Sequence, residues 1–171
     1  LKKLNINFKI NQKKINIILE NQFKKNIYYN HLLRIAINSK QISINLRKRQ
    51  KQKKFFKGFL INYVRPKPEI KNLYYGKILK ILNSINTNNS EFILYNKNII
   101  TEGCTTNIIC VKNKKLYIPK DDYYFGLTLK FILKNTKRKT LKSNITLEKL
   151  KEFEEILLVG SGKGVVALNN I

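Results

Sequence analysis

The sequence predicts an α+β fold, and three observations carry this prediction. Between residues 12 and 25, apolar side chains recur at the spacing of one face of a helix. Residues 29–64 contain segments that approach the alternation of β-strands. Residues 91–120 contain further short apolar segments divided by polar turns, which is typical of an antiparallel meander. The 171 residues have room for one good core or two small ones.

The segment Arg65-Pro66-Lys67-Pro68 predicts a linker between two domains. Each proline removes a backbone donor and biases the residue before it to an extended conformation. We therefore expect part of a small α/β domain over residues 1–65, a linker at 66–68 and a larger β-rich domain over 69–171.

The first domain is expected to contain one helix and three strands. The helix places four apolar residues on one face, namely Ile15, Ile18, Leu19 and Phe23. Strands are predicted within residues 29–37, 41–46 and 55–64, where apolar and polar residues tend to alternate.

The second domain continues from the meander into two helices and a strand. A helix is predicted after Gly126, with Leu129, Ile132 and Leu133 facing inward. Another helix is predicted to begin near Thr146, a residue type that caps helix N-termini. The last predicted strand is 156–159, and the glycine-rich segment 160–164 closes it.

The formal net charge of +25 raises the possibility of a nucleic-acid partner. The basic residues are mostly Lys, are spread from Lys2 to Lys163, and accompany many Asn and Ile residues, which indicates drift in base composition. The one concentrated run, residues 47–54, predicts a solvated loop. A basic nucleic-acid-binding protein is the alternative from another class, and it would need this run beside exposed aromatics such as Phe55 and Phe56. We expect no specific nucleic-acid partner.

The two cysteines, Cys104 and Cys110, form neither a zinc pattern nor a disulfide framework, and the chain has one histidine. No metal site is predicted. No apolar stretch approaches the ~18 residues of a membrane span, and the first residues lack the apolar core of a signal peptide. We therefore expect a cytoplasmic protein without a membrane partner.

Two segments have the composition of anion-binding loops. In residues 160–164, glycines allow backbone N–H groups to approach an anion, and Ser161 adds a hydroxyl. Gly126-Leu127-Thr128 opens a predicted helix, whose free N–H groups and dipole favour a phosphate. The simpler interpretation is a tight turn and a helix start. Lys163 is expected to be solvated, with a contact to the same anion as the alternative.

Four ordered segments resemble the class IV aminotransferases, a fold type IV family that includes branched-chain and D-amino acid aminotransferases and aminodeoxychorismate lyases. Residues 102–108, Glu-Gly-Cys-Thr-Thr-Asn-Ile, are similar to the signature of that family. Residues 126–128 and 155–166 resemble its later Gly-Ile-Thr segment and phosphate loop. Residues 69–73, Glu-Ile-Lys-Asn-Leu, resemble the segment of the cofactor lysine.

The resemblance implies pyridoxal 5'-phosphate as cofactor and assigns roles to individual residues. Lys71 would carry the cofactor and move a proton between the substrate and the cofactor. Glu102 would keep the pyridine nitrogen protonated. The phosphate would be held by the hydroxyls of Ser161 and Thr128 and by the N–H groups of Leu127 and Gly162.

The implied function is amino transfer between an amino acid and a 2-oxo acid, and the preferred substrates are of the branched-chain type. An aminodeoxychorismate lyase of folate synthesis and an inactive fragment are the alternatives. The resemblance also implies a β-rich barrel-like domain and a homodimer. Family members are longer at both ends. Their early part, which carries the active-site loop and an arginine that reaches the cofactor phosphate, has no counterpart before Leu1, so the chain is expected to lack both ends.

Overall fold

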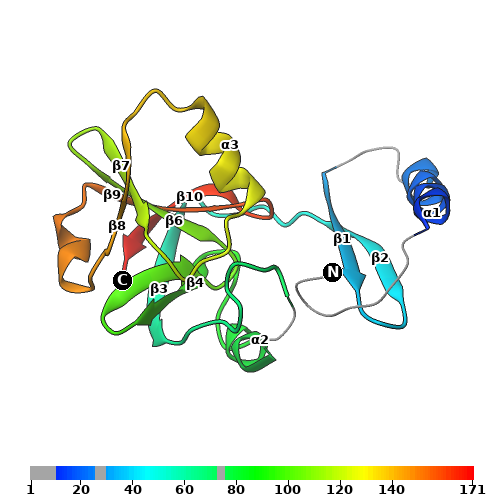
Figure 1. Ribbon diagram of the computed structural model, residues 1–171, viewed down its shortest axis with the longest axis horizontal. Coiled ribbons are helices and arrows are strands. Elements are labelled where there is room, and N and C mark those ends of the chain that lie inside the picture. Colours follow the sequence, from blue (N-terminus) through cyan, green and yellow to red (C-terminus); the bar gives the residue numbers. More distant parts are fainter. Residues whose placement is uncertain (1–10, 26–29, 73–75) are drawn as a thin grey trace. The chain divides into compact units, whose positions relative to one another are not determined.

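A computed structural model describes residues 11–25, 30–72 and 76–171 and divides the chain into two units, residues 1–50 and 51–171 (Figure 1). The predicted boundary at residue 65 differs from this division, because the strand formed by residues 55–62 belongs to the sheet of the larger unit. Of the residues used in the sequence analysis, Lys2, Tyr29 and Leu73 lie outside the described part.

The smaller unit contains a helix, α1 (Gln12–Lys24), and an antiparallel hairpin of β1 (His31–Ile37) and β2 (Ile42–Lys48). The helix begins at Asn11, whose side chain accepts a hydrogen bond from the Lys14 N–H at 3.0 Å and so caps the first turn. On the predicted apolar face, Ile15 and Leu19 are half-buried, whereas Ile18 and Phe23 are exposed.

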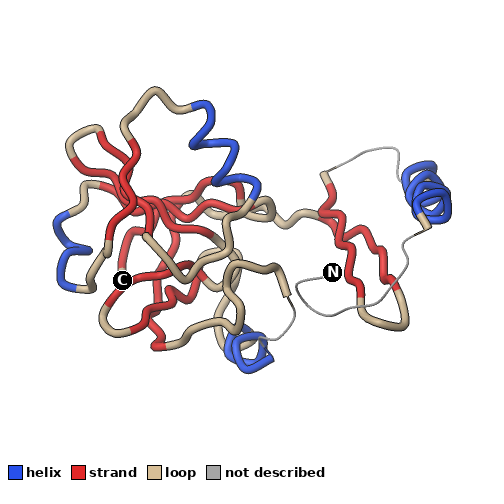
Figure 2. Tube along the Cα trace, in the orientation of Figure 1, coloured by secondary structure: helices blue, strands red, loops and turns tan. Residues whose placement is uncertain are grey.

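The larger unit is built on one curled sheet of eight strands (Figure 2). Its strands are β3 (Phe55–Asn62), β4 (Ser90–Asn96), β5 (Ile99–Gly103), β6 (Asn107–Lys112), β7 (Lys115–Pro119), β8 (Thr140–Ser143), β9 (Glu155–Gly160) and β10 (Gly164–Asn170). Their order across the sheet is β5-β4-β3-β10-β9-β6-β7-β8.

The predicted antiparallel meander over residues 91–120 is wrong in its connectivity. Two hairpins form, β4–β5 and β6–β7, but β5 and β6 are not neighbours, because β3, β10 and β9 enter the sheet between the hairpins. The pairs β10–β3, β3–β4 and β7–β8 are parallel. β10 is therefore the strand that joins the β5-β4-β3 half of the sheet to the β9-β6-β7-β8 half.

Both faces of the central strands are buried, which explains their nearly continuous apolar sequences. In β6, Ile108 and Cys110 pack into one core cluster, whereas Ile109 and Val111 pack into another on the opposite face. The second cluster is covered by helix α3 (Leu127–Asn135), whose Leu129 is completely buried. The helix predicted after Gly126, with Leu129, Ile132 and Leu133 inward, is confirmed.

Two further elements complete the unit. Helix α2 (Gly76–Leu82), which the sequence patterns did not predict, packs its buried side chains against Phe92 and Leu94 of β4. The helix predicted near Thr146 is only a 3-10 turn, η2 (Glu148–Glu152), with Leu147 at its N-cap position and no side-chain cap. Among the described residues, no helix is long and apolar enough to span a membrane.

Candidate active site

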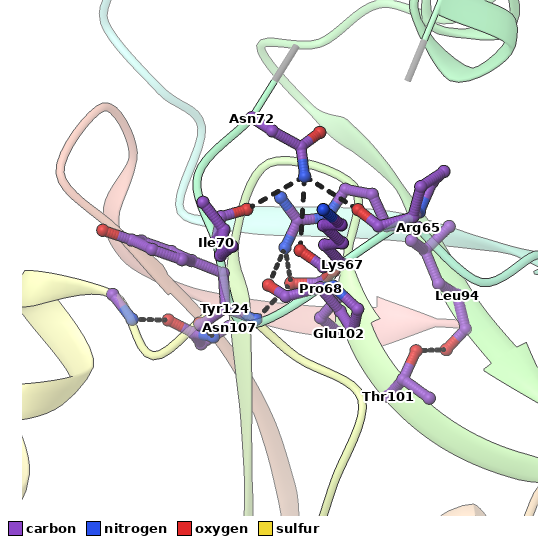
Figure 3. A network of polar contacts seen from close by, with 12 residues as sticks. Arg65, Lys67, Pro68, Ile70, Asn72, Leu94, Thr101, Glu102, Asn107 and Tyr124 are labelled. Carbon is purple, nitrogen blue, oxygen red and sulfur yellow. Dashed lines mark hydrogen bonds and ion pairs between the residues drawn. The ribbon is translucent and has the colours of Figure 1, made fainter. Parts of the chain in front are cut away.

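The segment predicted as a linker is a folded loop that presents Lys71. The buried Asn72 side chain donates hydrogen bonds to the carbonyl oxygens of Pro66 at 2.7 Å, Lys67 at 3.2 Å and Ile70 at 3.3 Å. These bonds draw the loop around one amide group (Figure 3). Asn72, the residue next to Lys71, is thereby fixed to the backbone of residues 66–70.

Arg65 ties the same loop to Glu102. Its Nε donates to Glu102 Oε1 at 2.8 Å, and its Nη2 donates to Glu102 Oε2 at 3.1 Å and to the carbonyl of Pro68 at 2.8 Å. The two side chains are 9% and 6% exposed, so this forked ion pair forms largely out of water. Sequence patterns did not single out Arg65. The only available signal was that arginine occurs five times among 35 basic residues.

Glu102 retains capacity for one more donor. Besides Arg65, its Oε2 accepts the Tyr124 N–H at 3.0 Å. A carboxylate offers about four lone-pair sites, and the three bonds leave one at Oε1. Burial raises the pKa of Glu102, while the ion pair and hydrogen bonds with Arg65 oppose this rise. A cationic or N–H group at the free position would stabilise the ionised form further.

Asn107 holds the loop that leads into α3. Its Nδ2 donates to the carbonyl of Tyr124 at 2.5 Å, and its Oδ1 accepts the Gly126 N–H at 3.1 Å. A Cβ on Gly126 would lie 2.6 Å from that same Oδ1, so only glycine fits here without displacing the amide. The spacing of Glu102 and Asn107 in the sequence motif thus has a structural reason, because both side chains bind the 124–126 loop.

Lys71 lies on the exposed side of this loop. Its Nζ is 5.7 Å from the centroid of the Tyr124 ring, and its side chain is open to solvent. A primary amine at such a position is accessible to an aldehyde. Tyr124 therefore contacts Glu102 through its backbone and Lys71 through its ring.

The two predicted anion loops meet. Thr128 Oγ1 lies 3.3 Å from Ser161 Oγ, although the residues are 33 positions apart. Gly126, the N-cap of α3, provides no side-chain hydrogen bond, so the N–H groups of Leu127 and Thr128 keep the free donors of a helix N-terminus. Gly162 follows Ser161 in the turn between β9 and β10. Uncapped N–H groups, two converging hydroxyls and a glycine turn are a donor set that fits a phosphate group.

Lys163 differs from both expectations. Its side chain is 10% exposed, and its Nζ lies 3.1 Å from Oε2 of the fully buried Glu91. The ammonium group is therefore paired with a carboxylate inside the protein rather than solvated or directed to an external anion.

The profile of the family described as "Amino-transferase class IV" matches residues 1–171. No curated protein sequence matches the chain significantly. Solved structures show the same fold. A protein from Legionella pneumophila, provisionally named 4-amino-4-deoxychorismate lyase, has a TM-score of 0.80 and 17% identity over 99% of this chain and 72% of its own. The branched-chain aminotransferase of Thermoproteus uzoniensis has a TM-score of 0.79 and 16% identity over 99% and 67%.

A third structure is that of an aminotransferase from Brucella abortus bound to pyridoxal phosphate. It has a TM-score of 0.60 and 14% identity, covering 75% of this chain and 50% of its own. The chain thus spans between half and about three quarters of the length of these three proteins.

Proposed function

Because the chain belongs to the class IV aminotransferases, which depend on pyridoxal 5'-phosphate, we propose that it transfers amino groups between an amino acid and a 2-oxo acid, with branched-chain substrates. The observation that supports this proposal is the 124–126 loop. Its backbone binds Glu102 and Asn107, its tyrosine ring lies beside Lys71, and it leads directly into the N-terminus of α3. The candidate lysine, acid and phosphate donors are thus joined by one short segment.

Lys71 and Glu102 have separate roles in this proposal. Lys71 would be the residue that holds the cofactor, and its amine, when free, would take the proton from the substrate α-carbon and carry it to the cofactor. Glu102 would hold the pyridine nitrogen of the cofactor protonated, because its carboxylate can accept one further hydrogen bond. When bound, pyridoxal 5'-phosphate supplies an electron sink for the negative charge that develops at the substrate α-carbon.

The phosphate is held by the N–H groups of Leu127, Thr128 and Gly162 and by the hydroxyls of Thr128 and Ser161. The closeness of the two hydroxyls supports this assignment. A phosphate dianion between them would accept from both, and the positive end of the α3 dipole would favour it further. Arg65, in contrast, is occupied by Glu102 and sets the orientation of that carboxylate.

The test of the covalent role is borohydride reduction in the presence of pyridoxal 5'-phosphate, followed by peptide mapping. We expect the label on Lys71 and its loss in Lys71→Arg. The nearby Lys67 and Lys77 serve as internal controls, because both are available to nonspecific modification. A label on either of them instead would show that Lys71 is not the cofactor lysine. An unlabelled protein would refute the enzymatic proposal.

An aminodeoxychorismate lyase is the second candidate, and the likeness to the Legionella pneumophila protein supports it. Such an enzyme would use the same lysine, acid and phosphate site but release pyruvate. The two candidates are separated by their products. With leucine and 2-oxoglutarate, an aminotransferase forms glutamate, whereas a lyase forms pyruvate from aminodeoxychorismate. Formation of neither product by cofactor-loaded protein would favour an inactive fragment.

We also propose that the protein is a cytoplasmic homodimer. Both cysteines are free, and Cys110 is completely buried as a thiol, which suits a reducing compartment. Light scattering of the purified chain tests the oligomeric state, and a monomer at micromolar concentration would contradict the dimer.

A further inference from the structure

The ion pair of Lys163 and Glu91 joins the glycine turn to the interior of the sheet. Lys163 belongs to the three-residue turn 161–163, between the paired residues Gly160 and Gly164. Its Nζ lies 3.1 Å from Glu91 Oε2, 3.4 Å from the carbonyl oxygen of Ser90 and 4.6 Å from the centroid of the Phe56 ring. A lysine in a glycine-rich turn would ordinarily extend into solvent, so this buried placement calls for a role.

Glu91 binds more than Lys163. Its Oε2 accepts the Thr105 hydroxyl at 2.6 Å and lies 3.4 Å from that of Thr106, and its Oε1 accepts the Phe92 N–H at 3.2 Å. Thr105 and Thr106 belong to the same motif as the proposed cofactor residue Glu102. One buried carboxylate thus connects the start of β4, the motif loop and the turn that carries Ser161.

The geometry excludes a free ammonium at the phosphate. A buried carboxylate without its counter-charge is strongly unfavourable, because little solvent replaces the lost partner. Lys163 therefore remains paired with Glu91. If its ammonium moved to the phosphate in place of an arginine, Glu91 would be left as an unpaired buried charge. Its effect on an anion must pass through the backbone of the turn.

We propose that Lys163 is a positioning residue for the phosphate site, which pins the 161–163 turn to Glu91 so that the Ser161 hydroxyl stays opposite Thr128. This inference rests on the proposed function, since it concerns the phosphate of the same cofactor. Ser161 lies two positions before Lys163 in a turn whose ends are paired strands, so anchoring one residue restricts the other. The ion pair takes no part in the chemistry at Lys71.

The experiment compares the affinities of the full chain for pyridoxal 5'-phosphate and for pyridoxal, which lacks the phosphate. Lys163→Met keeps the apolar stem over Phe56 but removes the charge. We expect it to weaken pyridoxal 5'-phosphate binding about five- to tenfold, the value of one well-placed hydrogen bond, and to leave pyridoxal binding unchanged. Glu91→Gln should give the same loss. Lys151→Met, which removes an exposed lysine of η2, is the matched control and should change neither affinity.

A double-mutant cycle with Ser161→Ala distinguishes positioning from direct contact. If Lys163 acts mainly by placing the Ser161 hydroxyl, most of the loss caused by Lys163→Met disappears in the Ser161→Ala background, whereas a direct phosphate contact would keep its full loss there. A gain of phosphate affinity in Glu91→Gln would also overturn the proposal, because it would mean that the released ammonium binds the phosphate.

A double variant separates the effect on stability from the effect on phosphate binding. The double variant Glu91→Gln/Lys163→Met contains no unpaired buried charge and should regain melting temperature relative to either single variant while keeping the weakened phosphate affinity. If the unaltered chain prefers pyridoxal 5'-phosphate and Lys163→Met prefers it equally, only the positioning role fails. If the unaltered chain shows no preference over pyridoxal, the proposed phosphate site itself fails.

Discussion

At the scale of single residues, Glu102 has two roles: its carboxylate is the counter-charge of Arg65, and it is the proposed partner of the cofactor. Glu102→Gln keeps the shape but removes the charge. Turnover of the folded enzyme should fall about 10²-fold or more, because the lost charge acts mainly in the transition state, while cofactor binding remains largely intact.

The same substitution should lower stability by about 3–5 kcal/mol, because it leaves the buried Arg65 unpaired. Denaturant unfolding measures this change, and turnover is then normalised to the folded fraction. Glu152→Gln, which breaks an exposed pair with Lys112, is the control and should change neither quantity appreciably. An unchanged rate in Glu102→Gln would assign Glu102 a structural role alone.

The thiols provide a pH-dependent prediction. Burial raises the pKa of Cys110 to about 12, and burial together with the nearby Glu91 and Glu102 raises the pKa of Cys104 to about 12. An unfolded thiol ionises near its ordinary pKa of 9.0, so the folded state holds its protons longer. The stability that the neutral thiols contribute is therefore full below about pH 9 and is lost as the pH rises towards 12.

Iodoacetamide labelling followed by mass spectrometry tests this behaviour. At pH 8 we expect slow labelling of Cys104 and none of Cys110 in the native state, and rapid labelling of both in denaturant, since the thiolate is the reactive form. Cys104→Ala assigns the two signals. Rapid labelling of Cys110 in the native state would show that the core around β6 opens readily to solvent.

The sequence singles out Lys71, Glu102, Thr128 and Ser161 because ordered motifs surround them, and the structure brings the last two together. It does not single out Arg65, and it predicts the wrong environment for Lys163, which is paired with the buried Glu91. Which of the 35 basic residues is buried depends on where its acidic partner lies in the folded structure. The partner of Arg65, Glu102, is 37 positions away in the sequence.

At the scale of elements, the start of α3 depends on one glycine. Gly126→Ala should lower the free energy of unfolding by about 1–3 kcal/mol, because the added Cβ displaces the Asn107 amide and leaves buried polar groups without partners. It should also weaken pyridoxal 5'-phosphate binding. The backbone angles of Gly126, φ −70° and ψ 155°, suit alanine, so the effect reports the contact and not strain.

Gly76→Ala is the matched control for this substitution. Gly76 begins α2, and a Cβ there would meet no atom within 4 Å. The change should be neutral or stabilise the protein by up to about 1 kcal/mol, as expected for alanine in a helix. Equal thermal shifts in the two variants would contradict the special role assigned to Gly126.

Local patterns predict individual elements better than their arrangement. The periodicity around Leu129 identifies α3, and alternation identifies most strands. The strand order was not predictable, because an apolar strand such as β3 could lie beside several others. The strand that joins the two halves of the sheet, β10, follows the last predicted strand and was itself missed. Short elements such as β8 and η2 have too few residues for a period to be visible.

At the scale of the whole molecule, the net charge of +25 should give weak and unselective binding to polyanions. Binding to heparin and to unrelated nucleic acids should be similar and should collapse by ~0.2 M salt, because it depends on counterion release. Filter binding over a salt series measures it. A sequence-specific complex that survives this salt concentration would instead indicate a true nucleic-acid partner.

The place of β10 in the sheet has a consequence for how the protein reaches its native state. Ala167 of β10 pairs with Phe55 of β3, so the continuous ladder between the two halves of the sheet depends on residues more than a hundred positions apart. On the other side, β5 meets the segment after β8 through an isolated bridge between Ile99 and Thr146. Loops of this length close slowly, and parallel pairings between distant segments delay folding. During synthesis on the ribosome, β3, β4 and β5 must therefore wait with an unpaired edge until β10 emerges, and this interval is when the chain is most exposed to aggregation.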